Sequence, residues 1–380
     1  MISKVILIGN YLPDKQESMI RFAHLLSTGF IEQGIHVDIW WPTVFVGGII
    51  KSTNTGTGKW LGYLDKYLIF PAVLKSRMKS EKLKNTAVKF HICDHSNAPY
   101  LKYLPLANTS ITCHDVIAIR GALGYSDSYQ PASTMGKRLQ KWIMQHLSIA
   151  HSIAFVSQHS FNQFKELVPA EAIKKNWCVI HNSFNNDFEP MDKKTAVVKT
   201  IAAGINPNVP FLLHVGSGSI RKNRILLLKM VNHLDPKYKI NICFAGENLD
   251  QELIEYAKGI ELSNQVVSIV KPDHQTLVAL YSMCAAFIFP SLSEGFGWPL
   301  IEAQACGAVV IASSNNPMPE VSGGAALHYD PTKPKDFAIG FETLKCEHLR
   351  QELIQNGFKN SLRFKTAIMI KKYQEFLNFT

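Results

Sequence analysis

One stretch of the chain, from Ala285 to Ser314, constrains the possible folds more than any other. The apolar run Ala285–Phe289 stops at a proline, which is typical of a short buried strand. A polar turn containing two glycines follows, and the next residues predict a helix over Pro299–Cys306 that ends at Gly307. Because Ala308–Ala312 is again apolar, the order is strand, loop, helix and strand, which is one repeat of a parallel α/β sheet.

The loop of this repeat has the features of an anion-binding site. Gly295 and Gly297 allow backbone N–H groups to approach a ligand closely, and the start of the helix adds partial positive charge. Glu294 precedes the helix, and Glu302 is expected in its first turn. Ionised carboxylates only accept hydrogen bonds, so two of them around a phosphate site favour a ligand rich in hydroxyl groups. These features together outline a nucleotide-sugar.

Two further loops carry candidate ligand-binding residues. Gly216 follows an apolar run, and Arg221 and Lys222 come a few residues later. A glycine turn with two fixed cations is suited to a diphosphate. His114 follows the predicted strand Ser110–Cys113, so it lies where open α/β sheets bind ligands. A histidine there can donate a hydrogen bond to a sugar hydroxyl or to charge near the anomeric carbon.

The chain is long enough for two domains. It has 380 residues, of which 46% are hydrophobic and 18% charged, so we expect it to be globular. The pattern predicts a Rossmann-like N-terminal domain over residues 1–185 and a C-terminal one over residues 200–360. The polar stretch from Asn185 to Lys199 is interpreted as the linker. An amphipathic helix is predicted over Phe364–Phe376.

The net positive charge is concentrated in the first half, because that half has fewer acidic residues. Residues 1–180 hold 20 Lys and Arg against 11 Asp and Glu, whereas residues 181–380 hold 20 against 19. Between Trp41 and Lys89, aromatic and basic residues are interleaved, which suits the interface of an anionic membrane. A solvated basic helix over an ordinary core explains the same pattern equally well. No nucleic-acid motif is present, so nucleic acid is not an expected partner.

From Pro290 to Gly307 the sequence resembles the retaining glycosyltransferases of family 4, the group 1 transferases, with their E-x7-E motif. The resemblance extends over most of the chain and is strongest from Phe211 to Asp330. It implies the GT-B fold, in which two Rossmann-like, doubly wound domains face each other across a cleft. The last helix, about residues 364–380, then crosses back to the N-terminal domain.

The resemblance also implies roles for individual residues. The N-terminal domain would bind the acceptor and the C-terminal domain the nucleotide-sugar donor. Catalytic roles fall to Glu294 and His114, while the participation of Asp115 as a base stays open. The donor-binding residues would be Gly9, Gly216, Arg221, Lys222, Gly295, Phe296, Gly297, Leu300 and Glu302. Neither a cofactor nor a metal ion is expected, because the cations and backbone N–H groups can stabilise the leaving diphosphate.

Three departures from the family pattern affect details of the site. Residues Lys15–Ser18 stand where the family has a glycine pair near the acceptor. Ser217 replaces the arginine that many members have after the first glycine of the diphosphate loop, so Arg221 and Lys222 must supply that charge. Glu247 interrupts the family's A-G-x-G pattern after a predicted strand.

The resemblance implies a retaining, metal-independent hexosyltransferase that uses a UDP- or GDP-linked sugar and a glycan or lipid-linked acceptor in surface polysaccharide or glycolipid synthesis. Two alternatives stay open. A GT-B sugar-nucleotide epimerase would form product from the nucleotide-sugar alone, and a non-catalytic subunit would bind it without turnover. A dehydrogenase is disfavoured because no GxGxxG follows the first predicted strand.

We expect a cytoplasmic protein, and peripheral association with the cytoplasmic face of a membrane stays open. No apolar run reaches the roughly 20 residues of a spanning helix, and the first residues do not resemble a signal peptide. The seven cysteines form no CxxC pair, and the six that lie in or beside apolar runs (all except Cys346) are interpreted as buried free thiols. His91 lies in the predicted strand Val88–Cys93 and His95 follows it; at the spacing of a strand they would be about 13 Å apart, too far to share a metal ion.

Overall fold

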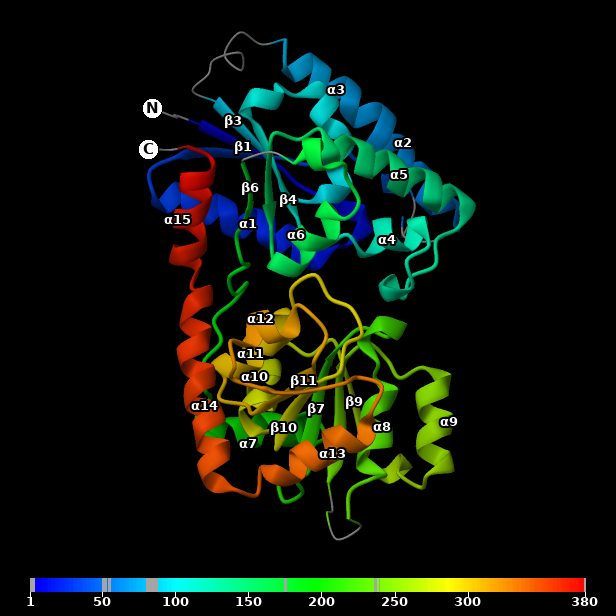
Figure 1. The fold of residues 1–380 in the computed structure, drawn as a ribbon, viewed down its shortest axis with the longest axis vertical. Helices are drawn as coiled ribbons and strands as arrows, with labels where there is room; N and C mark the ends of the chain where they lie inside the picture. The colour runs from blue at the N-terminus through cyan, green and yellow to red at the C-terminus, as the bar shows by residue number, and fades with distance from the viewer. Residues whose placement is uncertain are drawn as a thin grey trace. The chain divides into compact units, whose positions relative to one another are not determined.

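The computed structural model describes residues 4–49, 53, 56–79, 88–173, 176–235, 238 and 240–378. The chain divides into two compact units. The N-terminal unit contains residues 1–125, 131–185 and 366–380, and the C-terminal unit contains residues 126–130 and 186–365. Each unit is built around its own six-stranded sheet (Figure 1).

The sheet of the N-terminal unit is entirely parallel, with the strand order β2-β1-β3-β4-β5-β6. Its central strands are largely buried on both faces, because helices cover both sides of such a sheet. The strands are β1 (Lys4–Ile8), β2 (His36–Trp40), β3 (Val88–Ile92), β4 (Thr109–Cys113), β5 (Ser152–Phe155) and β6 (Asn176–Val179).

The helices of this unit connect successive strands. The α-helices are α1 (Glu17–Glu32), α2 (Gly56–Leu64), α3 (Phe70–Arg77), α4 (Ile117–Leu123), α5 (Thr134–Ser148), α6 (Gln158–Lys165) and α15 (Thr366–Phe376). Between α2 and α3 lies the π-helix η3 (Asp65–Ile69). The 3-10 helices are η1 (Leu12–Asp14), η2 (Gly47–Ile49), η5 (His95–Tyr103), η6 (Leu106–Asn108) and η8 (Ala170–Ala172).

The last helix, α15, belongs to the N-terminal unit, as the family resemblance predicts. It packs against α1, where a Cβ atom on Gly29 would lie 2.4 Å from the side chain of Ile370. A small residue is therefore required at this helix contact. The Tyr373 hydroxyl also lies 2.8 Å from Thr112 Oγ1 in the buried strand β4. Packing and a buried hydrogen bond thus fix the end of the chain to the first domain.

The sheet of the C-terminal unit is also parallel, in the order β12-β11-β10-β7-β8-β9. Its strands are β7 (Phe211–Gly216), β8 (Asn241–Gly246), β9 (Val266–Val270), β10 (Ala286–Phe289), β11 (Val310–Ser313) and β12 (Leu327–Tyr329). Its α-helices are α7 (Lys193–Ala202), α8 (Ile225–Val231), α9 (Gln251–Gly259), α10 (His274–Met283), α11 (Trp298–Ala305), α12 (Met318–Ser322), α13 (Pro334–Thr343) and α14 (Glu347–Ser361). The 3-10 helices are η7 (Ser126–Ser128), η9 (Ile220–Lys222), η10 (Ser263–Gln265) and η11 (Leu362–Phe364).

Each strand order has one point where the direction of winding reverses. In the C-terminal unit, successive strands run outward from β7 to β9, and the chain then returns to place β10 beside β7. In the N-terminal unit, the reversal lies between β1 and β3. Open α/β sheets bind ligands at the carboxyl ends of the strands beside such a reversal. The topology therefore selects the loops after β7 and β10 in one unit, and after β1 and β3 in the other.

Several predicted boundaries were wrong. The predicted linker from Asn185 to Lys199 includes the first turns of α7, which begins at Lys193 and packs against α10. Asp192 starts this helix by accepting a hydrogen bond from the backbone N–H of Thr195. Lysines in the stretch looked like linker composition, but they lie on an exposed helix surface. In the C-terminal repeat, α11 begins one residue earlier than predicted, at Trp298, so Glu302 lies in its second turn.

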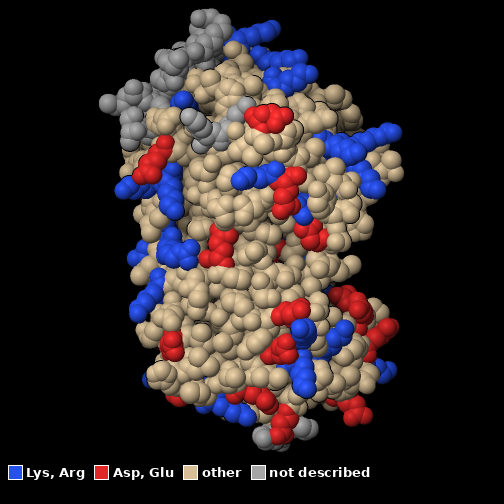
Figure 2. All heavy atoms as spheres, in the orientation of Figure 1, with Lys and Arg blue, Asp and Glu red and all other residues tan. Residues whose placement is uncertain are grey.

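The surface reflects the uneven charge of the sequence. On the face shown in Figure 2, Lys and Arg side chains gather over α3 and α5 of the N-terminal unit, while both signs are mixed over the C-terminal unit. Within the described parts of the chain, no helix is both long and apolar enough to cross a membrane.

Candidate active site

The loop after β10 brings the E-x7-E motif to the carboxyl edge of the C-terminal sheet. Gly297 has a φ of 106°, which L side chains rarely adopt, and this turn starts α11 at the next residue. Pro299 occupies the first turn of the helix, where its missing N–H costs no hydrogen bond. The local sequence therefore determines both the direction of the loop and the start of the helix behind it.

A buried cluster of three charges forms where this loop meets the loop after β7. Glu294 accepts hydrogen bonds from Lys222 Nζ at 2.6 Å and from Arg221 Nη1 at 2.7 Å, each through a different carboxylate oxygen. Arg221 also donates to the backbone carbonyl of Ser293. The structure thus brings together the two cations and the first motif glutamate, which lie more than 70 residues apart.

Backbone contacts hold η9, and with it both cations, against the β10 loop. The Arg221 carbonyl accepts a hydrogen bond from the N–H of Leu292 at 2.7 Å. Asn223, in the left-handed conformation, donates to the carbonyls of Pro290 at 3.2 Å and Pro331 at 2.8 Å. Asn223 therefore anchors this loop to two neighbouring segments of the C-terminal unit.

The electrostatics of the cluster favour ionised groups despite their burial. Burial alone would raise the pKa of Glu294, but the charges of Lys222 and Arg221 outweigh it and lower the pKa to about 2. Burial lowers the pKa of Lys222, and Glu294 opposes this effect. Two cations and one carboxylate leave the cluster with one excess positive charge, which suits an additional anion.

The second motif glutamate occupies a separate buried position on α11. Glu302 Oε2 accepts a hydrogen bond from the Tyr281 hydroxyl on α10 at 3.0 Å. Burial and the nearby carboxylate raise the pKa of Tyr281, so the tyrosine stays a hydrogen-bond donor. The charge of Glu302 also raises the pKa of Lys222, although less than that of Glu294, so both motif carboxylates favour the charged form of this lysine. Sequence reasoning missed Tyr281, because no local motif connects it with Glu302.

An acidic side chain contacts the glycine loop after β7. Gly218 N–H donates to Glu247 Oε2 at 2.7 Å, so the residue that departs from the A-G-x-G pattern contacts the expected phosphate loop. Gly216 is the last residue of β7, and a Cβ there would lie 3.5 Å from Lys222 Cδ. The predicted loop and cation are therefore adjacent.

Two predicted donor-binding residues lie mainly in the protein core. Leu300 is completely buried in α11. Phe296 is buried as well, and its ring packs edge-on against Trp298 and Phe364 at centroid distances of 6.0 and 5.7 Å. Their side chains position the loop and helix, so any direct contact with a donor would come from the backbone of this segment. Gly295, between Glu294 and Phe296, is also buried.

The corresponding edge of the N-terminal unit holds a different cluster, which sequence reasoning missed. Asn10, after β1, donates to Asp94 Oδ2 at 2.6 Å, and Asp94 follows β3. His95 Nδ1 lies 3.1 Å from the other oxygen of Asp94. Asn97 donates to Asn10 Oδ1 at 3.0 Å. These side chains gather at the reversal of strand order, which could be located only once the strand order was known.

The electrostatics of this cluster centre on one ion pair. Burial would raise the pKa of Asp94, but the His95 charge and hydrogen bonds outweigh it and hold the pKa well below its usual range. Burial would lower the pKa of His95, but Asp94 outweighs it and raises the pKa. The strand β3 ends at Ile92, one residue before the predicted end at Cys93, and His95 begins η5, so the strand spacing used to separate His91 from His95 does not apply.

Two other N-terminal candidates, His114 and Asp115, follow β4, which is the strand paired with β3. His114 follows β4, and its Nε2 lies 2.9 Å from the carbonyl of Cys93; burial lowers its pKa. Asp115 accepts a hydrogen bond from Ile117 N–H at 2.9 Å, at the start of α4. A Cβ atom at Gly9 would overlap the Trp41 ring, so the packing of this ring requires a glycine at this position.

Metal ligation and disulfide formation find no support in the described part of the chain. His91 hydrogen-bonds to Ser110 and Thr112 in the core, and no group of three or more His, Cys, Asp or Glu side chains among the described residues could hold a metal ion. All seven cysteines are free. Of the six cysteines predicted to be buried, all are buried except Cys178, which is half-buried; Cys346, which lay outside that prediction, is exposed.

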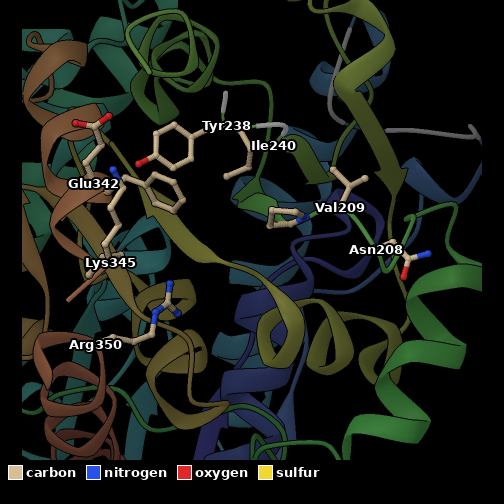
Figure 3. A pocket seen from close by; sticks show the side chains of 10 residues that line it. Asn208, Val209, Tyr238, Ile240, Glu342, Lys345 and Arg350 are labelled. Carbon is tan, nitrogen blue, oxygen red and sulfur yellow. The ribbon is translucent and has the colours of Figure 1, made fainter. Parts of the chain in front are cut away.

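A cavity of about 460 Å³ lies at the opposite end of the C-terminal sheet. Pro210 and Ile240, which line it, immediately precede β7 and β8 (Figure 3). Lys345 lies 4.6 Å from the centre of the Tyr238 ring in its wall. The cavity is therefore separate from the carboxyl edge that carries Glu294.

Comparison with known proteins finds a matching family model and several relatives. Residues 200–360 match the family described as Glycosyl transferases group 1. It is 38% identical over 196 residues to the serotype-specific mannosyltransferase WbdA of Escherichia coli, a match to 50% of this chain and 24% of the relative. It is 24% identical over 249 residues to the O-antigen chain mannosyltransferase RfbU of Salmonella typhimurium, covering 63% and 62% of the two chains. The chain therefore spans about a quarter of the length of the first relative and under two thirds of the second.

Solved structures show the fold over the full length. Sucrose-phosphate synthase from Thermosynechococcus elongatus superimposes with a TM-score of 0.75 at 16% identity, covering 99% of each chain. The Anabaena protein HepE, solved in complex with UDP and glucose, gives a TM-score of 0.71 at 15% identity over both entire chains. These likenesses and the two parallel sheets confirm the predicted GT-B fold.

Proposed function

We propose that this protein is a retaining hexosyltransferase that moves a sugar from a nucleoside-diphosphate donor to an acceptor in surface polysaccharide synthesis. The observation that carries the proposal is the buried cluster of Glu294, Arg221 and Lys222 at the reversal of strand order in the C-terminal sheet. It combines excess positive charge for a diphosphate with a carboxylate for hydroxyl groups. Mannose is the first candidate sugar, because several relatives carry the description mannosyltransferase.

Donor binding would use the two motif glutamates for different ends of the ligand. Glu302, oriented by Tyr281, would accept hydrogen bonds from the ribose hydroxyls. Arg221 and Lys222 would bind the diphosphate, with backbone N–H groups of the Gly295–Gly297 turn. Glu294 would then exchange part of its ion pairing for hydrogen bonds to the sugar hydroxyls.

The mechanism would depend mainly on electrostatic stabilisation. Cleavage of the bond between the anomeric carbon and the diphosphate oxygen transfers the bonding electrons to the diphosphate. Positive groups already held in place by the protein stabilise this charge without costly reorganisation. The departing diphosphate oxygen would accept the proton of the acceptor hydroxyl as the new bond forms on the same face, which retains the anomeric configuration. Arg221 and Lys222 would supply the charge that a metal ion provides in other transferases.

The N-terminal unit would bind the acceptor. Its carboxyl edge presents His114 and the Asn10, Asp94 and His95 cluster, whose polar atoms suit sugar hydroxyls. We further propose that the basic surface of this unit contacts an anionic membrane, where a lipid-linked acceptor would reside. Vesicle flotation tests this contact, and equal flotation with neutral and anionic vesicles would contradict it.

One assay separates the proposed transferase from its alternatives. The protein is incubated with UDP- and GDP-linked mannose and glucose, with and without octyl α-mannoside as acceptor. A transferase forms an elongated octyl glycoside, and carbon–hydrogen coupling at the new anomeric centre reports its configuration. An isomerised sugar nucleotide without acceptor would identify an epimerase. Donor binding in a thermal-shift measurement, without product from any acceptor preparation, would identify a non-catalytic subunit.

A further inference from the structure

A pocket of about 360 Å³ lies in the N-terminal unit between α2 and α5, which Figure 1 shows next to each other. It is remote in sequence from every residue assigned above to donor or acceptor chemistry. Its lining consists of Lys59, Trp60, Tyr63, Ser133, Met135, Gly136, Arg138, Leu139 and Trp142.

The floor of this α2–α5 pocket is aromatic. The Trp60 and Tyr63 rings meet edge-on at 5.9 Å, and Tyr63 packs on Tyr67 at 5.7 Å. Tyr67 in turn meets Trp142 at 5.1 Å, which joins α5 to the π-helix that follows α2. Such a connected set of rings offers a large apolar surface in a fixed shape.

Exposed apolar side chains extend the pocket onto the surface. Trp60 is 53% exposed, and Leu64 and Leu68, one and two turns further along, are 41% and 65% exposed. Residues spaced by four lie on one face of a helix, so these side chains form a stripe that leads from the pocket. Met135, on the opposite wall, is 48% exposed. Contiguous exposed apolar surface of this kind marks a site for an apolar partner.

The charged groups of the pocket are both positive. Lys59 contacts the Tyr63 ring at 5.9 Å, and Arg138 contacts Met135 Sδ at 4.0 Å. Neither forms an ion pair with the described residues, whereas nearby Lys66 is bound to Asp14 at 2.6 Å. The lining contains no Asp or Glu.

The polar atoms of the lining select the chemistry of the ligand. Lys59, Arg138 and the two indole N–H groups can only donate hydrogen bonds, so donors outnumber the two hydroxyl acceptors of Tyr63 and Ser133, of which Ser133 already accepts one bond from Gly136 N–H. Recognition of a neutral sugar needs acceptors as well as donors, while phosphate oxygens only accept. The geometry points to an apolar chain that carries a phosphate group, and we propose that the α2–α5 pocket binds a phosphorylated lipid.

Decyl phosphate, below its micelle concentration, is a suitable probe for calorimetric titration of the full chain. Binding is expected for decyl phosphate, and much weaker binding for inorganic phosphate and for decyl glucoside. Equal affinity for inorganic phosphate would identify a simple anion site, and equal affinity for decyl glucoside a neutral amphiphile site. Either result would overturn the proposal. No sugar donor is needed, so the outcome is independent of the proposed transfer reaction.

Matched double variants separate the pocket from general surface charge. Removal of two cations near a bound phosphate by Lys59→Ala with Arg138→Ala should weaken decyl phosphate binding about thirtyfold. The control is Lys137→Ala with Lys141→Ala, which removes two exposed cations of α5 outside the pocket and should leave binding within about twofold. Equal losses in both double variants would contradict a specific site. Trp60→Ala should weaken decyl phosphate more than inorganic phosphate, and an equal effect on both would also contradict it.

Discussion

The two sheets present similar topological positions with different chemistry. At the reversal of strand order in the C-terminal sheet, Glu294 is held by two cations, and the cluster carries excess positive charge. At the reversal in the N-terminal sheet, Asp94 is held by one ionisable partner, His95, and by amide and hydroxyl groups. The first arrangement suits a multiply charged phosphate, and the second suits neutral hydroxyls. Under the proposed function, the same fold would provide the donor and the acceptor with different electrostatic environments.

Glu294→Gln tests the C-terminal half of this comparison and should have the largest effect. The change keeps the shape of the side chain but removes the charge held between Arg221 and Lys222. Turnover should fall about 10²–10³-fold, the loss typical of one preorganised electrostatic contact. Initial rates with the best donor measure it. Glu252→Gln, on the exposed surface of α9, is the matched control and should retain full activity; full activity in both variants would remove Glu294 from catalysis.

Lys222→Met should mainly affect the donor. Because Lys222 is buried and its charge-assisted contact contributes about 1.5–3 kcal/mol, nucleoside-diphosphate affinity should fall roughly 10- to 150-fold. Calorimetric titration provides the measurement, with Lys229→Met on α8 as control. If both variants bind the nucleotide like the native protein, the positive cluster is not the diphosphate site.

Asp94→Asn tests the N-terminal cluster through stability and its pH dependence. Loss of the charged partner should lower the free energy of unfolding by about 2 kcal/mol. The folded pKa of Asp94 is lowered, so its contribution is present above pH 3.8 and is lost on acidification. The folded pKa of His95 is raised, so its contribution is present below pH 6.5 and declines as the pH rises through the folded value.

The native protein should therefore gain most from this ion pair between those two pH values. Thermal unfolding across the pH range should show a smaller variation in Asp94→Asn than in the native protein. An unchanged pH profile would show that Asp94 and His95 do not act as an ion pair, and the contrast between the two sheet edges would then be lost.

Glu247→Gln should produce the smallest change, and in the opposite direction. Glu247 places a negative charge at Gly218, beside the expected diphosphate. Because the side chain is exposed, its repulsion is screened, and the variant should bind a nucleoside diphosphate about two- to fivefold more tightly. The gain should shrink as salt is added. Weaker binding instead would mean that Glu247 supports the glycine loop more than it repels the ligand.

The sequence predicted the C-terminal unit better than the N-terminal one for a physical reason. Glu294, Gly297 and Glu302 lie within nine residues, so one strand, turn and helix determine most of their geometry. Arg221 and Lys222 were predicted as ligands from their own loop, but their ion pairs with Glu294 depend on β7 and β10 being neighbours. Strand order is a tertiary property that a local pattern does not contain.

The missed residues all depend on such distant contacts. Asn10 and Asp94 are 84 positions apart and meet only because β1 and β3 pair. Tyr281 reaches Glu302 from another helix. The linker error had a local cause, because α7 begins with two lysines and a threonine, and this start resembles a polar connection. Contiguous motifs could therefore be recognised in the sequence, whereas the cluster around Asp94 could be located only once the fold was known.

The central claim is that the C-terminal cluster binds an activated sugar, and a crystal structure with the preferred nucleotide-sugar tests it most directly. The account predicts that diphosphate oxygens lie about 3 Å from Lys222 and Arg221, with the ribose hydroxyls at Glu302 and the sugar hydroxyls at Glu294. A nucleotide bound in the cavity at the opposite end of the C-terminal sheet, lined by Tyr238 and Lys345, with Glu294 still paired to both cations, would contradict it.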